Sequence, residues 1–440
     1  MPLSGFPELL PAQRIVELTV LDRLRRVFEL HGFTPLETAS VESLDQLLRK
    51  GEIEKEVYVL RRLHADDSDE HAGLGLHYDL TVPFARYVLD NAGRLEFPFR
   101  RYQIQRAWRG ERPQEGRYRE FTQADIDVVA RDELPFHYDV EIARVIAEAL
   151  AALDFLPPLR LQINNRRLIE GFYRGIGAAD VAAVMRTIDK MDKVPGDVIR
   201  ELLVEDAGLT AEQADQCLAL AAIRTPDTSF VEQVRALGVS SELLATGLDE
   251  LAVVINGCAD VSGVTVEADL RIARGLDYYT GTVFETRMAG YESVGSICSG
   301  GRYESLASEG KTTYPGVGIS LGVTRLLVPL FQRGVLTASR LVPSVVLVAL
   351  PNEQARRDCD AVANQLRARG IAAEVAAAAQ KYGRQIRYAE RRGIPFVWFP
   401  GEPHEVKDIR SGDQVPADPA SWQPPDNDLR PQVIAQKVEP

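Results

Sequence analysis

The chain has 440 residues, of which 45% are hydrophobic and 26% charged, with a formal net charge of −13. This length predicts two or three domains, each with its own core. The acidic balance argues against a protein that coats nucleic acid indiscriminately, although it is compatible with a local basic surface. The first residues have neither a basic start nor an apolar run, and no stretch of about 18 apolar residues occurs. We therefore expect an unexported, cytoplasmic protein.

Four cysteines are scattered along the chain, without a Cys-x-x-Cys pair and without a histidine at metal-ligand spacing. This pattern predicts neither a disulfide framework nor a zinc site. We expect reduced, mostly packed thiols at Cys217, Cys258, Cys298 and Cys359.

The N-terminal region begins with an expected helix. Apolar residues at 15, 18, 21, 24 and 28 have nearly helical spacing and predict an amphipathic helix over residues 11–31. Further on, HYDLTVPFARY predicts a short strand that ends at Pro83, followed by a helix. In that arrangement Asp79 and Thr81 point the same way.

Residues 99–128 predict two strands joined by an arginine-rich loop. In the first strand, Tyr102 and Ile104 alternate with polar residues, and in the second, Gln123 and Asp127 share one face with Phe121. We expect an antiparallel pair with one polar face. Seven arginines against two glutamates give residues 100–119 a net charge of +5 within an acidic chain.

The second half of the chain divides into three parts. Helical spacing interrupted by glycine and proline predicts helices over residues 165–256. Strand-like pattern resumes at Gly263 and leads to a helix from about Gly322. From Pro343 onward, strands alternate with helices, which predicts a small parallel sheet followed by an irregular Pro- and Asp-rich tail.

The polar residues of the first domain predict a site with two chemically different ends. Carboxylate and amide oxygens of Asp79, Gln123 and Asp127 suit a ligand that donates hydrogen bonds. Arginines from three separate segments, Arg109, Arg274 and Arg325, suit a polyphosphate, because a guanidinium presents paired donors to phosphate oxygens. Together these ends match an amino acid whose carboxylate meets the α-phosphate of ATP.

Three motifs, in order, resemble those of histidyl-tRNA synthetases, a class II synthetase family. RGLDYYTG at 274–281 resembles the histidine-specific signature, WRGERPQEGRYREFTQADID resembles class II motif 2, and GVGISLGVTRL resembles motif 3. The similarity extends from about residue 4 to about residue 410. It implies an α+β fold in which an antiparallel class II sheet is flanked by helices. The implied domains are a catalytic domain at 1–163 and 259–335, a helical insertion at 164–258, and an α/β anticodon-binding domain with an irregular tail at 340–440.

The resemblance also implies how histidine is bound. The α-amino group would contact Asp79, Thr81 and Gln123. The imidazole would be surrounded and selected by Asp127 and the adjacent pair Tyr278 and Tyr279. These assignments agree with the sharing of one strand face by Gln123 and Asp127.

For the nucleotide, the resemblance implies a set of arginines. Arg274 would bridge the histidine carboxylate and the α-phosphate, and with Arg109 it would be catalytic. Arg109 and Arg325 would bind the α- and γ-phosphates, while Phe121 and the Arg117-Tyr118 segment would lie near adenine.

The implied reaction forms histidyl-adenylate and transfers histidine to the terminal adenosine of histidine tRNA. Magnesium is expected on the outer phosphates, with Glu111 counted among the ATP-binding residues and no metal ligand assigned. The implied partners are L-histidine, ATP and histidine tRNA, and a homodimer is expected, with no membrane association. A second basic cluster, in residues 381–392 of the terminal domain, suits the phosphates of an anticodon stem.

Other interpretations stay open at the level of sequence. The aspartates are also compatible with ordinary ion pairs, the two tyrosines with core packing, and the arginines with a solvated loop face. Ala39 in motif 1 and Thr324 in motif 3 depart from the family pattern. A regulatory subunit of ATP phosphoribosyltransferase, or a paralogue that activates histidine for another acceptor, is the alternative function.

Overall fold

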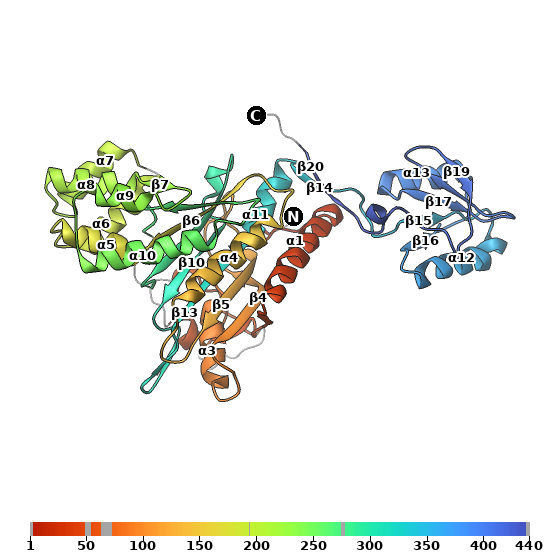
Figure 1. Cartoon of the computed structure of the whole chain (residues 1–440). Helices are drawn as coiled ribbons and strands as arrows, with labels where there is room; N and C mark the ends of the chain where they lie inside the picture. The colour runs from red at the N-terminus through yellow and green to blue at the C-terminus, as the bar shows by residue number, and fades with distance from the viewer. Residues whose placement is uncertain (1–2, 49–53, 63–72, 193, 274–277, 437–440) are drawn as a thin grey trace. The chain divides into compact units, whose positions relative to one another are not determined.

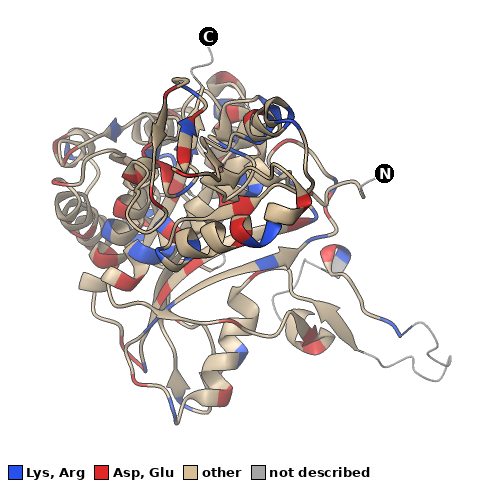
Figure 2. Ribbon diagram, turned by 90° about the vertical axis from the view of Figure 1, so that its right-hand side faces the viewer, with Lys and Arg blue, Asp and Glu red and all other residues tan. Residues whose placement is uncertain are grey.

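The computed structural model describes residues 3–48, 54–62, 73–192, 194–273 and 278–436, which form two compact units (Figure 1). The first unit contains Leu21–Pro329 together with the N-terminal residues up to Pro7, and the second contains Glu8–Val20 and Leu330 onward. Acidic and basic residues are interspersed along the ribbon (Figure 2). None of the helices in the described part of the chain is long and apolar enough to span a membrane.

The first unit is built on a nine-stranded sheet in the described residues. Its order is β1-β4-β5-β13-β10-β9-β6-β8-β7. The strands, in that order, are Thr34–Pro35, Phe99–Trp108, Glu120–Val129, Gly316–Gly322, Cys298–Tyr303, Thr282–Met288, Leu159–Asn165, Thr265–Asp269 and Arg224–Thr225. Only the β1–β4 and β6–β8 pairs among these are parallel. The mainly antiparallel sheet and its helices confirm the expected α+β class.

Strands β4 and β5 have the two faces that alternation predicts. Ala124, Ile126 and Val128 are buried, on the face opposite Gln123 and Asp127. Helix α4, His137–Ala151, contacts β5 and β13 and buries Ile142 and Ile146. Burial of this apolar face leaves the polar face of the same strands to form the site.

The segment that precedes helix α3 differs from the predicted strand. The strand in this region is β3, Leu74–Leu76, which pairs with β2, Val41–Ser43, and α3 begins at Thr81. Pro83 therefore lies inside the first turn, where its missing N–H costs nothing. The predicted strand ending at Pro83 was wrong because a proline can start a helix as well as end a strand.

The region predicted to form helices, residues 165–256, is largely helical in the structure. Its helices are α5 Arg166–Gly175, α6 Val181–Ile188, α7 Gly196–Glu205, α8 Ala211–Ala221, α9 Phe230–Arg235 and α10 Glu242–Gly257, with a 3-10 turn at Asp189–Asp192. Helices α5 and α10 pack closely, since a Cβ on Gly171 would lie 2.3 Å from the Leu244 nitrogen. Strand β7 was not expected within this region. The predicted domain boundaries around it stay predictions.

Two helices contain residues of both units: helix α1, Pro11–Leu30, and helix α11, Val323–Gln332. Both agree with their predicted starts. The remaining elements of the first unit are α2 Leu44–Leu47, α3 Thr81–Asn91, β11 Ser308–Glu309, β12 Thr312–Thr313 and 3-10 turns at Glu54–Glu56 and Glu292–Val294.

The second unit has a five-stranded sheet of order β16-β15-β17-β18-β19 in its described residues. These strands are Ala373–Val375, Val346–Val348, Phe396–Phe399, Glu405–Asp408 and Gln414–Pro416. The first three are parallel, as expected, whereas β18 and β19 extend the sheet in antiparallel fashion. The accompanying helices are α12 Arg356–Ala368 and α13 Tyr382–Arg392, with a 3-10 turn at Glu353–Ala355.

The Pro- and Asp-rich tail is irregular, as predicted, but it is packed. The Trp422 ring lies 5.1 Å from Phe396 and 5.7 Å from Trp398, centroid to centroid, in edge-to-face contacts. Arg369 donates hydrogen bonds to the carbonyls of Pro419 and Trp422. After a 3-10 turn at Asp426–Asp428, strand β20, Val433–Ala435, pairs with β14, Leu336–Ala338. The tail is thus part of the second unit's core.

Replacing Trp422 by Ala should lower the free energy of unfolding of the second unit by about 2 kcal/mol, because it removes a large half-buried aromatic ring. Denaturation can be followed through the fluorescence of Trp398. The control is Val415→Ala, on exposed β19 surface. Equal unfolding midpoints for the two variants would show that the tail contributes nothing to this core.

Candidate active site

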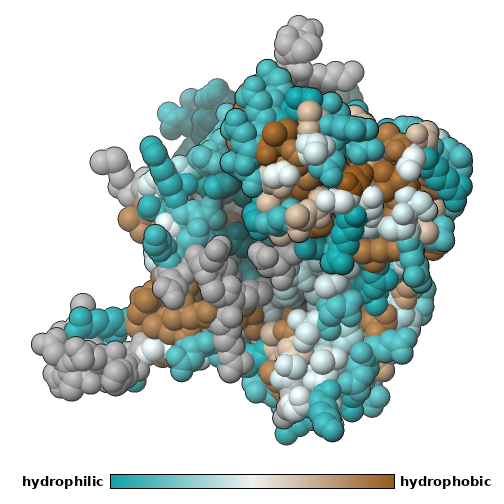
Figure 3. Space-filling view, turned by 90° about the vertical axis from the view of Figure 1, so that its left-hand side faces the viewer, coloured by the Kyte–Doolittle hydropathy of each residue, from teal (hydrophilic) through white to brown (hydrophobic). Residues whose placement is uncertain are grey.

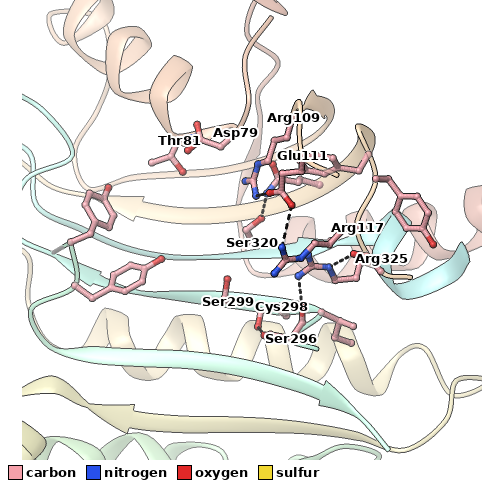
Figure 4. Close-up of a pocket in the computed structure, with 18 residues that line it drawn as sticks. Asp79, Thr81, Arg109, Glu111, Arg117, Ser296, Cys298, Ser299, Ser320 and Arg325 are labelled. Atoms are coloured by element: carbon pink, nitrogen blue, oxygen red, sulfur yellow. Dashed lines mark hydrogen bonds and ion pairs between the residues drawn. The ribbon is translucent and has the colours of Figure 1, made fainter. Parts of the chain in front are cut away.

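The first unit has a cavity of about 250 Å³ on the polar face of its sheet. Of the predicted site residues that the structure describes, all except Asp127 line it. Arg274 lies outside the described residues, as does Asp277. In Figure 4, Asp79 and Thr81 lie toward one end of the cavity and Arg109, Arg117 and Arg325 toward the other. The structure therefore brings together residues from five separate segments of the chain.

At the first end, Asp79 is fixed by the start of helix α3. Its Oδ1 accepts hydrogen bonds from the backbone N–H groups of Thr81 (3.1 Å) and Val82 (2.9 Å). Gln123 is anchored across the sheet, since its Nε2 donates to Ser320 Oγ at 2.6 Å. Its Oε1 is buried without a hydrogen-bond partner in the structure. This end therefore offers a carboxylate and an amide oxygen to a ligand that donates hydrogen bonds.

Asp127 lies behind the cavity lining, with a 6% exposed surface. Its Oδ2 is 2.7 Å from Arg101 Nη2, and its Oδ1 accepts a 3.0 Å hydrogen bond from the Tyr303 hydroxyl. Gly318 faces it across the sheet, and a Cβ there would lie 2.0 Å from Asp127 Oδ1. Only a glycine leaves room for this carboxylate.

Tyr278 and Tyr279 close the same end of the cavity. Their rings meet edge to face, with centroids 5.3 Å apart, and Tyr278 stacks on Tyr303 at 5.2 Å. Burial raises the pKa of both Tyr278 and Tyr279 above the ordinary value, and the negative charge of nearby aspartates adds to the effect. Both hydroxyls therefore stay protonated at neutral pH and can donate hydrogen bonds.

The opposite end is rich in guanidinium groups that are oriented by backbone carbonyls. Arg109 Nε donates to Tyr78 O at 2.9 Å, and its guanidinium lies 5.1 Å from the centroid of the Phe121 ring. Arg325 donates to Gly116 O at 2.5 Å and to Ser296 O at 2.8 Å. These carbonyls fix the orientation of the guanidinium groups at the cavity lining without adding a negative charge of their own.

Glu111 is the carboxylate at this end. It lies 3.8 Å from Arg109 Nη1 and 3.6 Å from Arg117 Nη1, so it is in ion-pair range of both. Tyr118 completes the rim, and burial raises the pKa of its hydroxyl. The predicted ATP-binding residues thus share one end of the cavity, although their individual roles stay predictions.

Sequence reasoning missed four small polar residues of the cavity: Ser296, Cys298, Ser299 and Ser320. Ser320 lies opposite Asp125 in the pairing of β13 with β5, and only this register identifies it as a site residue. One departure from the family motifs has a local explanation, since Thr324 Oγ1 accepts a hydrogen bond from Thr122 N at 2.8 Å. Thr38 is hydrogen-bonded to Gln103 and Gln105 of β4, and nothing in the structure explains its neighbour Ala39.

Asp125 is a second buried carboxylate on this face, between Gln123 and Asp127. Burial raises the pKa of Asp125 to about 7, and the neighbouring Asp127 and Asp79 add to the effect, whereas Arg101 and Ser320 oppose it. Its charge therefore changes near neutral pH.

Gly318→Ala should displace Asp127, because the added methyl would occupy the position of its carboxylate oxygen. We expect at least a tenfold weaker histidine affinity, about 1.4 kcal/mol or more, measured by calorimetry. Gly290→Ala is the control for a glycine-to-alanine change without a steric clash, because a Cβ there would meet nothing within 4 Å. Because Gly290 has φ +78°, that control itself loses some stability. An unchanged histidine affinity in Gly318→Ala would contradict the close-packing argument.

Asp125→Asn tests the raised pKa through the pH dependence of stability. A carboxyl whose pKa is higher in the folded state destabilises that state as pH rises from its unfolded value of 3.8 through about 7. Between pH 5 and 7 the wild type should therefore lose up to about 1.4 kcal/mol per pH unit relative to Asp125→Asn. Parallel denaturation curves of the two proteins at several pH values measure this difference, and a constant difference would contradict it.

Comparison with known proteins identifies the relatives of this chain. The family described as Histidyl-tRNA synthetase matches residues 5–326, and the family described as Anticodon binding domain matches residues 344–414. Proteins named histidine–tRNA ligase from Cutibacterium acnes and Micrococcus luteus are 57% and 58% identical, each alignment covering 98% of both chains.

Solved structures agree with these matches. A histidyl-tRNA synthetase from Nostoc sp. PCC 7120 has a TM-score of 0.84 at 34% identity, covering 95% of this chain and 96% of that one. A protein described as an ATP phosphoribosyltransferase regulatory subunit/histidyl-tRNA synthetase from Bacillus halodurans C has a TM-score of 0.71 at 19% identity, covering 88% and 96%. The second likeness shows a shared fold alone. The resemblance drawn from the three sequence motifs is confirmed.

Proposed function

The chain belongs to the histidyl-tRNA synthetase family, and we propose that it activates L-histidine with ATP and transfers it to the terminal adenosine of histidine tRNA. One observation carries this proposal: a single cavity has hydrogen-bond acceptors at one end and guanidinium groups at the other. An amino acid joined through its carboxylate to the α-phosphate of ATP has the complementary distribution of charge.

Histidine occupies the end formed by strand β5 and helix α3. Asp79, Thr81 and Gln123 bind the α-ammonium group, for which a carboxylate and an amide oxygen are suitable acceptors. Asp127 accepts a hydrogen bond from the imidazole, and Tyr278 and Tyr279 enclose the ring. A carboxylate next to neutral phenols distinguishes a ring that carries an N–H from an apolar ring of similar size.

ATP occupies the guanidinium end. Arg109 and Arg325 bind phosphate oxygens, and Phe121, Arg117 and Tyr118 border the adenine. The carboxylate oxygen of histidine attacks the α-phosphorus, a new P–O bond forms, and the bond to the β-phosphate oxygen breaks to release pyrophosphate. Arginines oriented before the reaction stabilise the charge that develops on the phosphorus oxygens without further rearrangement.

Arg274 is proposed as the catalytic bridge between the two ends on the strength of the sequence signature. Its neighbours Tyr278 and Tyr279 line the cavity, which is compatible with that role. Magnesium is proposed to accompany ATP. Glu111, the carboxylate at the phosphate end, suits Mg²⁺, which takes one or two carboxylates plus phosphate oxygens and water. When bound with ATP, the ion would neutralise charge on the outer phosphates.

The second step and the tRNA contacts are proposed from the terminal unit and from the family. Arg384, Arg387 and Arg391 are exposed on helix α13, and their spacing places them on one face. Such a face suits the phosphates of the tRNA anticodon stem. The hydroxyl of the terminal ribose then attacks the carbonyl of histidyl-adenylate and releases AMP.

A cytoplasmic homodimer is the proposed working form. Figure 3 shows apolar surface interrupting a largely hydrophilic face of the molecule. Exposed apolar side chains near β2 and β3 include Val41, Leu48, Val59 and Leu74. Contiguous apolar surface of this kind suits a contact with a second copy.

The alternative function is a regulatory subunit or a paralogue with another acceptor. The anticodon-binding match at 344–414 and the retained Arg109 and Arg325 favour the charging enzyme. Histidine-dependent exchange of labelled pyrophosphate into ATP tests activation, and charging of purified tRNA tests transfer. We expect both activities. Absence of exchange would remove the catalytic proposal, and exchange without charging would favour the paralogue.

Arg109→Ala and Arg274→Ala should each reduce pyrophosphate exchange by about 10²-fold or more, because each removes a donor that stabilises the transition state. Arg112→Ala is the matched control, since Arg112 is exposed in the same loop as Arg109 and does not line the cavity. Wild-type exchange rates in Arg109→Ala or Arg274→Ala would refute the role of that arginine.

A further inference from the structure

We propose that Arg101 is a positioning residue for substrate selection: its buried guanidinium holds the carboxylate of Asp127 in place to accept the hydrogen bond of the imidazole. This inference rests on the proposed function, because it requires histidine in the cavity. It extends that function to a residue outside the predicted site.

Arg101 acts through Asp127 and not on the ligand. The two residues are direct cross-strand partners of β4 and β5, and Nη2 of Arg101 is 2.7 Å from Oδ2 of Asp127. The Arg101 side chain is 0% exposed, and it does not line the cavity. Any effect of Arg101 on histidine must therefore pass through a neighbour.

The guanidinium is itself held from other directions. Its Nη1 donates to Gln103 Oε1 at 3.3 Å, and its central carbon lies 4.3 Å from the centroid of the Phe84 ring. Gln103 in turn donates to Thr38 Oγ1 and Gln105 Oε1. The Phe84 ring and the hydrogen-bonded amides of Gln103 and Gln105 therefore hold the Arg101 guanidinium in one position beside Asp127.

Each oxygen of Asp127 has a different environment. Oδ2 meets Arg101, whereas Oδ1 meets the Tyr303 hydroxyl from β10 and the backbone of Gly318 from β13. Two other carboxylates lie close by in the described residues: Asp125, two residues away on β5, and Asp79, whose negative charge, like that of Asp127, raises the pKa of Asp125. Without Arg101, two buried carboxylates would lie close together without a buried cation beside them, which favours protonation of one. A protonated Asp127 would be a poorer acceptor for the imidazole N–H.

A purely structural ion pair is the competing explanation for these contacts. Breaking such a pair would lower stability and would disturb histidine and ATP binding alike. A positioning role instead affects histidine selectively, and only while Asp127 is present. The two explanations therefore differ in which substrate is bound more weakly. They also differ in whether the effects of substituting Arg101 and Asp127 on histidine affinity are additive.

The test compares Arg101→Met, Arg101→Lys, Asp127→Asn and the double variant Arg101→Met/Asp127→Asn. Arg100→Met is the matched control, because Arg100 is the adjacent arginine of β4 and pairs with Glu141 instead. Histidine and ATP affinities are measured by calorimetry, and KM and kcat by pyrophosphate exchange. Thermal unfolding reports whether each variant is folded.

For Arg101→Met we expect a histidine Kd and KM at least about tenfold higher, with the ATP KM unchanged, since an adjacent opposite charge is worth roughly one to three pK units to a carboxylate. The loss of histidine affinity in Arg101→Met should be larger at pH 6 than at pH 8. Arg101→Lys should recover part of the affinity, Arg100→Met should resemble the wild type, and the double variant should bind histidine no worse than Asp127→Asn.

Wild-type histidine affinity in Arg101→Met would overturn the proposal, as would equal losses for histidine and ATP or additive losses in the double variant. If Arg101→Met does not fold, Arg101→Lys decides: unchanged histidine affinity at every pH would overturn the proposal. A wild type that binds histidine but exchanges no pyrophosphate would refute the proposed reaction alone, whereas one that binds no histidine would refute both.

Discussion

The antiparallel register of β4, β5 and β13 is the constraint on which the site depends. It places Arg101, Asp127 and Gly318 side by side across three strands. The absence of a side chain at Gly318 lets the Asp127 carboxylate occupy the space above its backbone. A shift by one residue would turn every polar side chain of this face toward the apolar side, where helix α4 packs. The acceptor end of the cavity therefore follows from backbone pairing.

Charge burial accounts for the division of the cavity into two ends. Carboxylates gather on the sheet, where Arg101 provides a buried cation and Tyr303 a hydroxyl donor. The arginines of the other end are oriented by carbonyl oxygens, and Glu111 lies within ion-pair range of Arg109 and Arg117. Burial raises the pKa of Asp125 to about 7, even though the positive charge of Arg101 opposes this shift. A ligand with an ammonium group at one end and phosphates at the other complements this arrangement.

Much of this architecture was predictable from the sequence. Alternation over residues 99–128 predicted β4 and β5 with the correct polar face, because one face of each strand carries apolar side chains and the other carries polar ones, although both faces are largely buried. The two-residue strand β7 and the strands β18 and β19 escaped prediction, since they are too short for a periodic signal. The start of α3 was wrong because Pro83 fits the first turn of a helix.

Within the site, the sequence motifs identified most of the residues that line the cavity, but not the residues that hold them in position. Arg101 belonged to a visible arginine cluster, yet nothing in the sequence separates it from the exposed arginines of that cluster. Its burial depends on the cross-strand partner Asp127 and on the Phe84 ring, both distant in sequence. Ser320 and Thr324 were equally hidden, because their contacts are made across strands. Arg274 lies outside the described residues, and its role stays a prediction.

A crystal structure with histidine and a non-hydrolysable ATP analogue tests the central claim most directly. The account predicts an imidazole nitrogen within about 3 Å of the Asp127 carboxylate, with the α- and γ-phosphates beside Arg109 and Arg325. Adenine between Tyr278 and Tyr279, or a histidine side chain directed away from Asp127, would contradict it.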